Sequence, residues 1–288
     1  GHIFRLHLDD FQGTRGLMYR IIKFILIILV LCYTLLPIYW IIVTSFKPPL
    51  EYTTRTPTLL PQNITLDHYK TVLFEEHFGR YLANTVSIAV SAVVISLCIA
   101  FLASYALARF HFPYKFDRLF LIWALLVKMV PPIALAVPLY TILKTGHLIN
   151  TKPGVVMVYQ IYTLPYCIWM LLGFIRDIPK ELEEAASIDG ASPFRVIWSV
   201  ILPLVAPGLV ATAIFSMIMG WNEFIYALLF LRTPDAFTLP IHIANYITEY
   251  ETLWGPLMSI GLLSSLPILV LSGFLQKRLL KGFSMTLK

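Results

Sequence analysis

The chain has 288 residues, of which 58% are hydrophobic and only 13% are charged, and its mean hydropathy is +0.76. A soluble domain of this length averages about 45–50% apolar and about 25% charged residues, so the composition excludes a water-soluble globular domain, a disordered chain, collagen and a coiled coil. The formal charge of +6 is spread thinly among apolar residues and does not indicate nucleic-acid binding.

Six apolar runs are long enough to cross a bilayer as helices, which requires roughly 20 residues each. Four of them contain no Asp, Glu, Lys or Arg, whereas the third contains Lys128 and the fifth contains Glu223. The first run is longer than the apolar part of a signal peptide and no small-residue cleavage site follows it, so we expect it to remain as an anchor. The predicted spans are residues 24–46, 84–108, 119–143, 154–174, 208–231 and 253–276.

The distribution of basic residues predicts the orientation of these spans. The two termini and the second and fourth loops carry 14 Lys and Arg residues, and the other three loops carry 7. Cytoplasmic loops are enriched in Lys and Arg, so both termini are expected in the cytoplasm. The sequence thus predicts a cytoplasmic N-terminal arm (1–23), a six-helix transmembrane domain (24–276) and a cytoplasmic tail (277–288).

The loop of residues 175–203, between the fourth and fifth spans, contains helix-starting and helix-ending residues in an order that indicates two short helices. Asp177 and Pro179 are typical of a helix start, Gly190 of a helix end, and Ser192 of a second start. Acidic residues in the first turn of a helix are stabilised by the positive end of the helix dipole. The first of the two predicted helices has three such residues, Glu181, Glu183 and Glu184. The pattern predicts a helix, a glycine corner and a second helix against the membrane, although an amphipathic connector would also fit it.

Several motifs of this chain resemble one family. Glu184-Ala185-Ala186, Gly190 and Val200-Ile201-Leu202-Pro203 match, in identity and spacing, the EAA signature of permease subunits of ATP-binding-cassette (ABC) importers. Other motifs between about residues 24 and 281 resemble the maltose-type carbohydrate branch of these permeases: Ser45-Phe46-Lys47, Trp221-Asn222-Glu223-Phe224, Thr238-Leu239-Pro240 and Leu266-Pro267.

The resemblance implies an all-α polytopic membrane protein with a cytoplasmic EAA coupling helix between helices 4 and 5. That helix would sit in a groove on a separate ATPase. The residues expected to couple to the ATPase are Glu184, Ala185, Ala186, Asp189, Gly190 and Pro203. This chain has no GxxxxGK[ST] motif, so we expect it to be a non-catalytic subunit without a bound cofactor, with ATP and Mg²⁺ on the partner chains.

The same resemblance implies the partners and the location. It implies a second homologous permease subunit, two cytoplasmic ATPase subunits and a periplasmic solute-binding protein, with membrane lipid around the spans and no nucleic acid. The location would be the bacterial inner membrane, crossed several times. The substrate would be a saccharide, with a polyol, glycerol phosphate or another non-sugar solute as the alternative.

The residues predicted to line the substrate path are Lys128, Glu223, Asn222 and Tyr162. Lys128 has two interpretations: it forms a buried ion pair with Glu223, or it faces the cavity and offsets the charge of an anionic substrate such as a uronate oligosaccharide. Glu223 either lines the path or makes a structural polar contact. Tyr162 either stacks on sugar rings or packs between helices.

The fifth loop, residues 232–252, is predicted to contact the binding protein through Phe237, Tyr246 and Tyr250, unless it is merely solvated. No metal site is expected, because the histidines show neither HxxxH nor HExxH spacing and the three cysteines are far apart. An ion-coupled secondary transporter would require more intramembrane acids than one. A membrane enzyme would require a nucleophile motif that the sequence lacks.

Overall fold

The computed structural model describes residues 2–54 and 56–286, and the side chains of 19–54 and 56–274. In these ranges every regular element is a helix or a helical turn. The predicted tail therefore lies outside the residues whose side chains are described, as does the predicted arm up to residue 18. The elements are α1 (His2–Ser45), α2 (Pro49–Tyr52), α3 (Asp67–Lys70), η1 (Thr71–Glu75), α4 (Phe78–Arg109), η2 (Pro113–Lys115), α5 (Phe116–Met129), η3 (Pro132–Leu135), α6 (Ala136–Thr145), α7 (Lys152–Arg176), α8 (Glu181–Ile188), α9 (Pro193–Val196), η4 (Ile197–Ile201), α10 (Leu202–Trp221), α11 (Ile225–Phe230), η5 (Pro234–Ala236), α12 (Leu239–Ala244) and α13 (Trp254–Thr286).

Five helical segments of the described residues are long and apolar enough to cross a membrane, and a bent pair of helices supplies a sixth candidate. This agrees with the all-α polytopic fold predicted from the sequence. The segments are Tyr19–Ser45, Phe78–Arg109, Lys152–Arg176, Pro193–Trp221 and Trp254–Phe274, and the bent pair is Pro113–Met129 with Pro132–Thr145. The chain divides into two units, residues 1–71 with 252–262 and residues 72–251 with 263–288.

The third span is not the continuous helix that the sequence predicted. α5 ends at Met129, and the two halves of the predicted span meet at an angle of 101°. Pro131 and Pro132 explain the break, because proline has no amide hydrogen to donate and disfavours the helical conformation of the residue before it. Val130 accordingly has extended backbone angles (φ −71°, ψ 123°).

The fifth span also differs from the prediction of one helix over 208–231. The helix begins earlier, at Pro193, and runs through α9, η4 and α10 to Trp221. It then stops, and after Asn222–Phe224 the short helix α11 begins at Ile225. The second helix predicted for the loop 175–203 therefore begins where expected, but it is the start of the membrane segment and not a separate helix.

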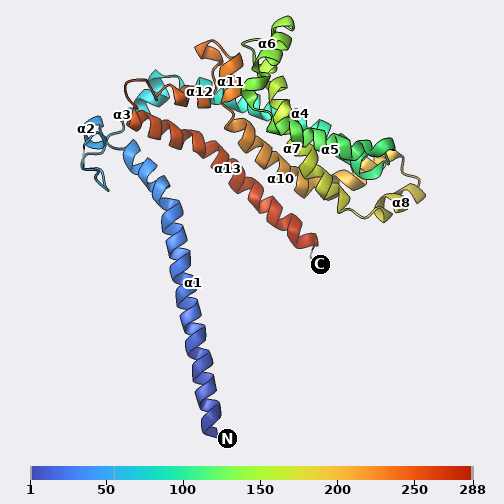
Figure 1. Ribbon diagram of the computed structural model, residues 1–288, viewed down its shortest axis with the longest axis horizontal. Helices are drawn as coiled ribbons and strands as arrows, with labels where there is room; N and C mark the ends of the chain where they lie inside the picture. Colours follow the sequence, from blue (N-terminus) through green and yellow to red (C-terminus); the bar gives the residue numbers. More distant parts are fainter. Residues whose placement is uncertain (1, 55, 287–288) are drawn as a thin grey trace. The chain divides into compact units, whose positions relative to one another are not determined.

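The second unit is built around α4, which packs against α7 and α10 (Figure 1). The face of α4 that is buried there carries small residues at helical spacing, which allow backbones to approach closely in a membrane bundle. These residues are Ala89, Ala92, Ser96, Ala100 and Ser104. α10 also packs closely on α7: a Cβ atom added to Gly208 would lie 2.4 Å from the Phe174 ring, so that contact requires glycine.

Hydrogen bonds within this bundle connect α4 with α7. Ser96 of α4 bonds to both Gln160 and Thr163 of α7, at 2.6 Å each, and Ser104 donates to the carbonyl oxygen of Ile168 at 3.0 Å. Polar groups that have no access to water need such internal partners. α4, α7 and α10 therefore form one closely packed body that carries the sites described below.

The first unit has a compact polar arrangement at the C-terminal end of α1. Lys47 is buried, donates from Nζ to the Thr58 carbonyl, and lies 5.1 Å from the centre of the Trp40 ring. Burial raises the pKa of the Glu51 carboxyl, but hydrogen bonds from the amides of Gln62 and Asn63 and the Thr58 hydroxyl, together with the Lys47 charge, lower it below its ordinary value. The segment after the first span is thus ordered by its own polar contacts.

Candidate coupling loop and substrate path

The predicted helix, glycine corner and second helix are present between α7 and α10. α8 is Glu181–Ile188, and Gly190 follows it with a φ of +86°, a left-handed conformation that favours glycine. The amide of Ala191 donates to the carbonyl of Ala186 (2.9 Å) and the amide of Gly190 to that of Ser187 (3.1 Å), which is the Schellman pattern of a helix end. This corner fixes the direction in which the chain leaves α8.

The second helix also begins as predicted, since the Ser192 hydroxyl accepts a hydrogen bond from the amide of Arg195 at 3.4 Å. The predicted start of the first helix is wrong. α8 begins at Glu181, after a turn in which no side chain caps the helix, so Asp177 and Pro179 precede it instead of forming its first turn. The acidic first turn is confirmed, since α8 opens with Glu181, Glu183 and Glu184.

The six predicted coupling residues are mostly accessible. Ala186 is half-buried and packs against the apolar cluster formed by the adjoining ends of α4, α7 and α10, so a small side chain is required there. The other five, Glu184, Ala185, Asp189, Gly190 and Pro203, are exposed. Ile188, also on α8, has 86% of its surface exposed. The loop thus offers a mixed apolar and acidic surface beyond the packed helices.

The sequence interpretation missed the contact that holds α8 in place. Glu183 forms a buried ion pair with Nε of Arg109, at the end of α4, and accepts a hydrogen bond from the Tyr105 hydroxyl at 2.8 Å. Arg109 also donates to the carbonyl oxygen of Ile178 at 2.9 Å. The signal in the sequence was Arg109 itself, which directly follows the uncharged run 84–108, but only the fold reveals its partner.

Lys128 does not form the ion pair with Glu223 that was one of its two interpretations. Among the described residues none of the ion pairs joins the two side chains. The Lys128 ammonium instead lies 5.0 Å from the centre of the Tyr166 ring of α7, and the residue is exposed on the chain surface. The pair was predicted for two unbroken spans, whereas the third span breaks after Met129 and the helix of the fifth ends at Trp221.

Glu223 has a structural role as the N-terminal cap of α11. Its two carboxylate oxygens accept hydrogen bonds from the amides of Tyr226 (2.8 Å) and Ala227 (3.1 Å), and the Tyr159 hydroxyl also bonds to it. A carboxylate at a helix N-terminus satisfies amides that have no partner within the helix. The structure thus places Glu223 in the structural polar contact considered above.

The other two predicted path residues lie near this cap. Tyr162 stacks parallel to Tyr226 with 6.2 Å between ring centres, and its buried hydroxyl has no hydrogen-bond partner among the described residues. Asn222 is exposed and borders a cavity of about 300 Å³ whose other walls come from Trp221, Phe224, α12 and Ser264 of α13. Thus Glu223, Asn222 and Tyr162 lie in one region, whereas Lys128 lies beside Tyr166, one turn farther along α7.

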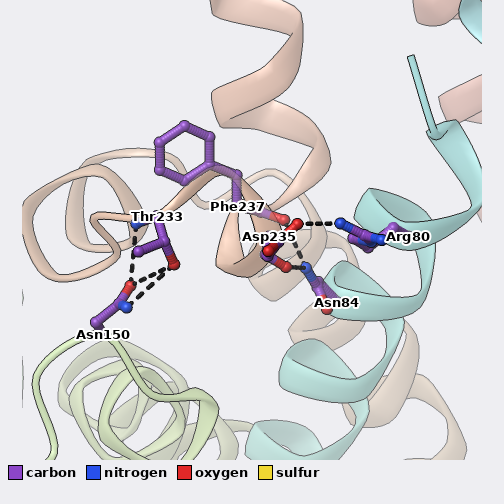
Figure 2. Close-up of polar contacts among 6 residues, drawn as sticks. All are labelled: Arg80, Asn84, Asn150, Thr233, Asp235 and Phe237. Carbon is purple, nitrogen blue, oxygen red and sulfur yellow. Dashed lines mark hydrogen bonds and ion pairs between the residues drawn. The ribbon is translucent and has the colours of Figure 1, made fainter. Parts of the chain in front are cut away.

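The fifth loop is held against the start of α4 by side chains of α4 and of the loop before α7 (Figure 2). Asn84 donates to the carbonyl oxygens of Asp235 (2.8 Å) and Phe237 (2.9 Å), and Arg80 pairs with the Asp235 carboxylate. Asn150 bonds to the hydroxyl of Thr233 at 3.1 Å. The first part of the loop is therefore ordered by these bonds, while its residues 232–235 remain exposed.

Of the three aromatic residues predicted to contact a binding protein, only Tyr250 is fully available, with 96% of its surface exposed. Phe237 is half-buried against the core. The prediction for Tyr246 is wrong, because this residue is 4% exposed and its hydroxyl bonds to Glu76. Burial, reinforced by that carboxylate, raises the pKa of Tyr246, and burial lowers the pKa of the neighbouring His242 against the opposing effect of Glu76.

The arrangement of spans around an EAA loop agrees with a comparison of the sequence with protein families. The model described as "Binding-protein-dependent transport system inner membrane component" matches residues 96–284. The chain belongs to this family. The resemblance to permease subunits of carbohydrate ABC importers is thereby confirmed, and this family member is a non-catalytic, multi-pass inner-membrane protein whose ATPase lies on partner chains.

Two relatives match almost the whole permease. The diacetylchitobiose uptake system permease protein DasC of Streptomyces coelicolor is 36% identical over 86% of this chain and 89% of its own length. The trehalose transport system permease protein SugB of Mycobacterium tuberculosis is 37% identical over 89% of this chain and 93% of its own. A crystal structure of a bacterial ABC transporter involved in import of the acidic polysaccharide alginate has the same fold, with a TM-score of 0.73 and 22% identity. The match covers 90% of this chain and 96% of that chain.

The cap at Glu223 yields a testable prediction for this permease. Replacing Glu223 with Ala removes the acceptor for two amides and should reduce stability by about 1–3 kcal/mol, whereas Glu223→Gln keeps an acceptor and should lose less. The midpoint of thermal unfolding of the purified complex measures this, with Asn222→Ala as the neighbouring control. If Glu223→Gln abolished uptake without lowering that midpoint, the charge would serve the substrate path instead.

Proposed function

We propose that this permease forms half of the translocation path of an importer for a saccharide, and that closing and opening of separate ATPase subunits alternately expose a central cavity to the two sides of the membrane. The observation that carries the proposal is the α8 corner. A helix closed by a Schellman motif and continued directly into the segment Pro193–Trp221 transmits displacement as a rigid unit. A flexible loop would absorb that displacement.

The partners follow from the same proposal. A second homologous permease subunit completes the path, and two cytoplasmic ATPase subunits, which bind ATP and Mg²⁺, receive the surface around Glu184, Ala185, Asp189 and Gly190. A periplasmic binding protein delivers the solute and contacts the fifth loop at Tyr250 and Phe237. Two features support these contacts: the exposed side chains of α8, including Ile188, and the hydrogen bonds that hold the first part of the fifth loop on α4.

The substrate class is a saccharide, and we infer that it is an anionic one such as a uronate oligosaccharide. The relatives named above import diacetylchitobiose and trehalose, and the similar solved transporter imports acidic alginate. An exposed ammonium on a membrane helix is costly in lipid, so Lys128 needs water, a partner subunit or an anionic ligand near it. A neutral polyol, glycerol phosphate or another non-sugar solute is the alternative.

We propose that the path follows α7, along the Tyr162 ring, which stacks on Tyr226, and the Tyr166 ring, over which the Lys128 ammonium lies. Aromatic faces suit sugar rings, and an ammonium suits a carboxylate. In this arrangement Lys128 and Tyr162 contact solute, Asn222 borders its entrance, and Glu223 shapes the path by holding the start of α11.

One prediction of the proposed function concerns the corner at Gly190. Gly190→Val should abolish transport and the stimulation of ATPase activity by loaded binding protein, because a branched residue is strained at a φ of +86°. Gly190→Asn is the matched control, since asparagine tolerates this conformation, and it should keep most of both activities. Uptake and ATPase assays in reconstituted vesicles measure the difference. Normal stimulation in Gly190→Val would refute the proposed coupling.

The second prediction concerns the substrate. Lys128→Gln should reduce uptake of a uronate oligosaccharide about tenfold, equivalent to the loss of one charge-assisted contact, and change uptake of a neutral oligosaccharide much less. Lys144→Gln, which removes an exposed charge from α6, serves as the control and should affect neither. An equal loss for both saccharides, or no loss for either, would contradict the anionic-substrate assignment.

The third prediction concerns orientation, for which the excess of Lys and Arg in the termini and even loops supports cytoplasmic ends. A cysteine at the exposed position Asn245 should react with a membrane-impermeant maleimide added outside, and loaded binding protein should slow that reaction. A cysteine at Ser187, on α8, should react only when the reagent reaches the cytoplasmic face. The reverse pattern would overturn the proposed topology.

A further inference from the structure

The contact between α8 and α4 is unusual because it buries charge on both sides. The side chains of Arg109 and Glu183 are 8% and 14% exposed, respectively. The side-chain contacts of the pair join residues distant in the sequence: Arg109 donates to Glu183 and to the Ile178 carbonyl, and Glu183 also accepts from Tyr105. We call these four residues the Arg109 cluster. Isolated burial of either charge would be strongly unfavourable, so the cluster exists only while α8 is docked on α4.

The cluster completes a set of three connections between α8 and the membrane helices. The chain joins α8 to α7 through residues 177–180 and to α9 and α10 through the Gly190 corner. Neither covalent connection reaches α4. The Arg109 cluster supplies that link at the last turn of α4, while the hydrogen bonds of Ser96 and Ser104 join α4 to α7 deeper in the bundle.

We propose that Arg109 and Glu183 are positioning residues for coupling, and that their ion pair makes α4 move with α8 when the ATPase subunits displace it. This inference rests on the proposed function of the α8 corner and adds the route by which the displacement reaches a helix to which α8 is not covalently joined. Without the cluster, the last turn of α4 would follow α8 only indirectly, through its packing on α7 and α10, and more ATP would be hydrolysed for each solute that crosses the path.

The guanidinium geometry makes the inference specific for arginine. Nε of Arg109 donates to the Glu183 carboxylate, and a terminal amino group of the same side chain donates to the carbonyl oxygen of Ile178, which follows the end of α7. A lysine carries the same charge but has a single nitrogen and cannot hold both acceptors in this fork geometry. Arg109→Lys therefore separates the positioning role from the mere presence of a positive charge.

The experiment uses the complete importer in vesicles and measures ATP hydrolysed per solute imported. Arg109→Lys and Glu183→Gln should each raise this ratio about fivefold or more, within the usual range of coupling between sites. Tyr105→Phe, which removes one hydrogen bond and leaves the ion pair, should raise it less. Arg118→Lys, an exposed arginine at the start of α5, is the matched control and should leave the ratio unchanged.

Two further variants keep the test decisive if a single substitution prevents assembly. The exchange Arg109→Glu with Glu183→Arg restores opposite charges and should recover assembly and part of the coupling. The double variant Arg109→Gln with Glu183→Gln should be no worse coupled than either single substitution, because both act through one pair.

The outcomes distinguish this inference from the proposed function. If the variants lowered the amount of assembled complex but left the ratio of ATP to solute unchanged, the cluster would be a structural contact only and the inference would be overturned. If Gly190→Val lost coupling while Arg109→Lys and Glu183→Gln kept it, the α8 corner would couple without α4. If Gly190→Val itself remained coupled, the proposed function would fail first.

Discussion

Close packing of α4 against α7 and α10 is the interaction on which the second unit depends. In a bilayer there is little hydrophobic force between apolar helices, so association relies on contact area and internal hydrogen bonds. Small residues such as Ala92 and Ala100 bring the backbones together, and Ser96 and Ser104 bond to α7 across the contact. Both ends of this bundle then serve as platforms, one for α8 and the other for the fifth loop.

At each break in the spans, backbone amides and carbonyls lose their hydrogen-bond partners within the helix and need new ones. Pro131 and Pro132 end α5 and leave Lys128 near the break, on an exposed surface. At the end of α10 the carboxylate of Glu223 accepts the first amides of α11, which allows the chain to change direction without orphaned donors. The two intramembrane charges of the sequence thus have different roles: one caps a helix, and the other remains available to a solute or a partner.

The two ends of the bundle are built by the same principle. At one end Arg109 and Glu183 hold α8, and at the other Asn84 and Arg80 hold the fifth loop (Figure 2). In both cases α4 contributes side chains from a terminal turn to a segment far away in sequence. In the proposed importer α8 meets the ATPase and the fifth loop meets the binding protein, and α4 is the helix that both segments contact.

The sequence by itself determined the membrane class, the all-α fold, the EAA loop, the left-handed corner at Gly190 and the Ser192 cap, because these depend on composition, local backbone preference and residues close in the chain. Tertiary structure alone decided the partners of Arg109 and Glu223, the burial of Tyr246 and the failure of the Lys128–Glu223 pair. Those outcomes depend on which helix ends meet and where a span breaks. Apolar periodicity cannot reveal either, since a lipid-facing surface and a helix-facing surface are equally apolar in a membrane bundle.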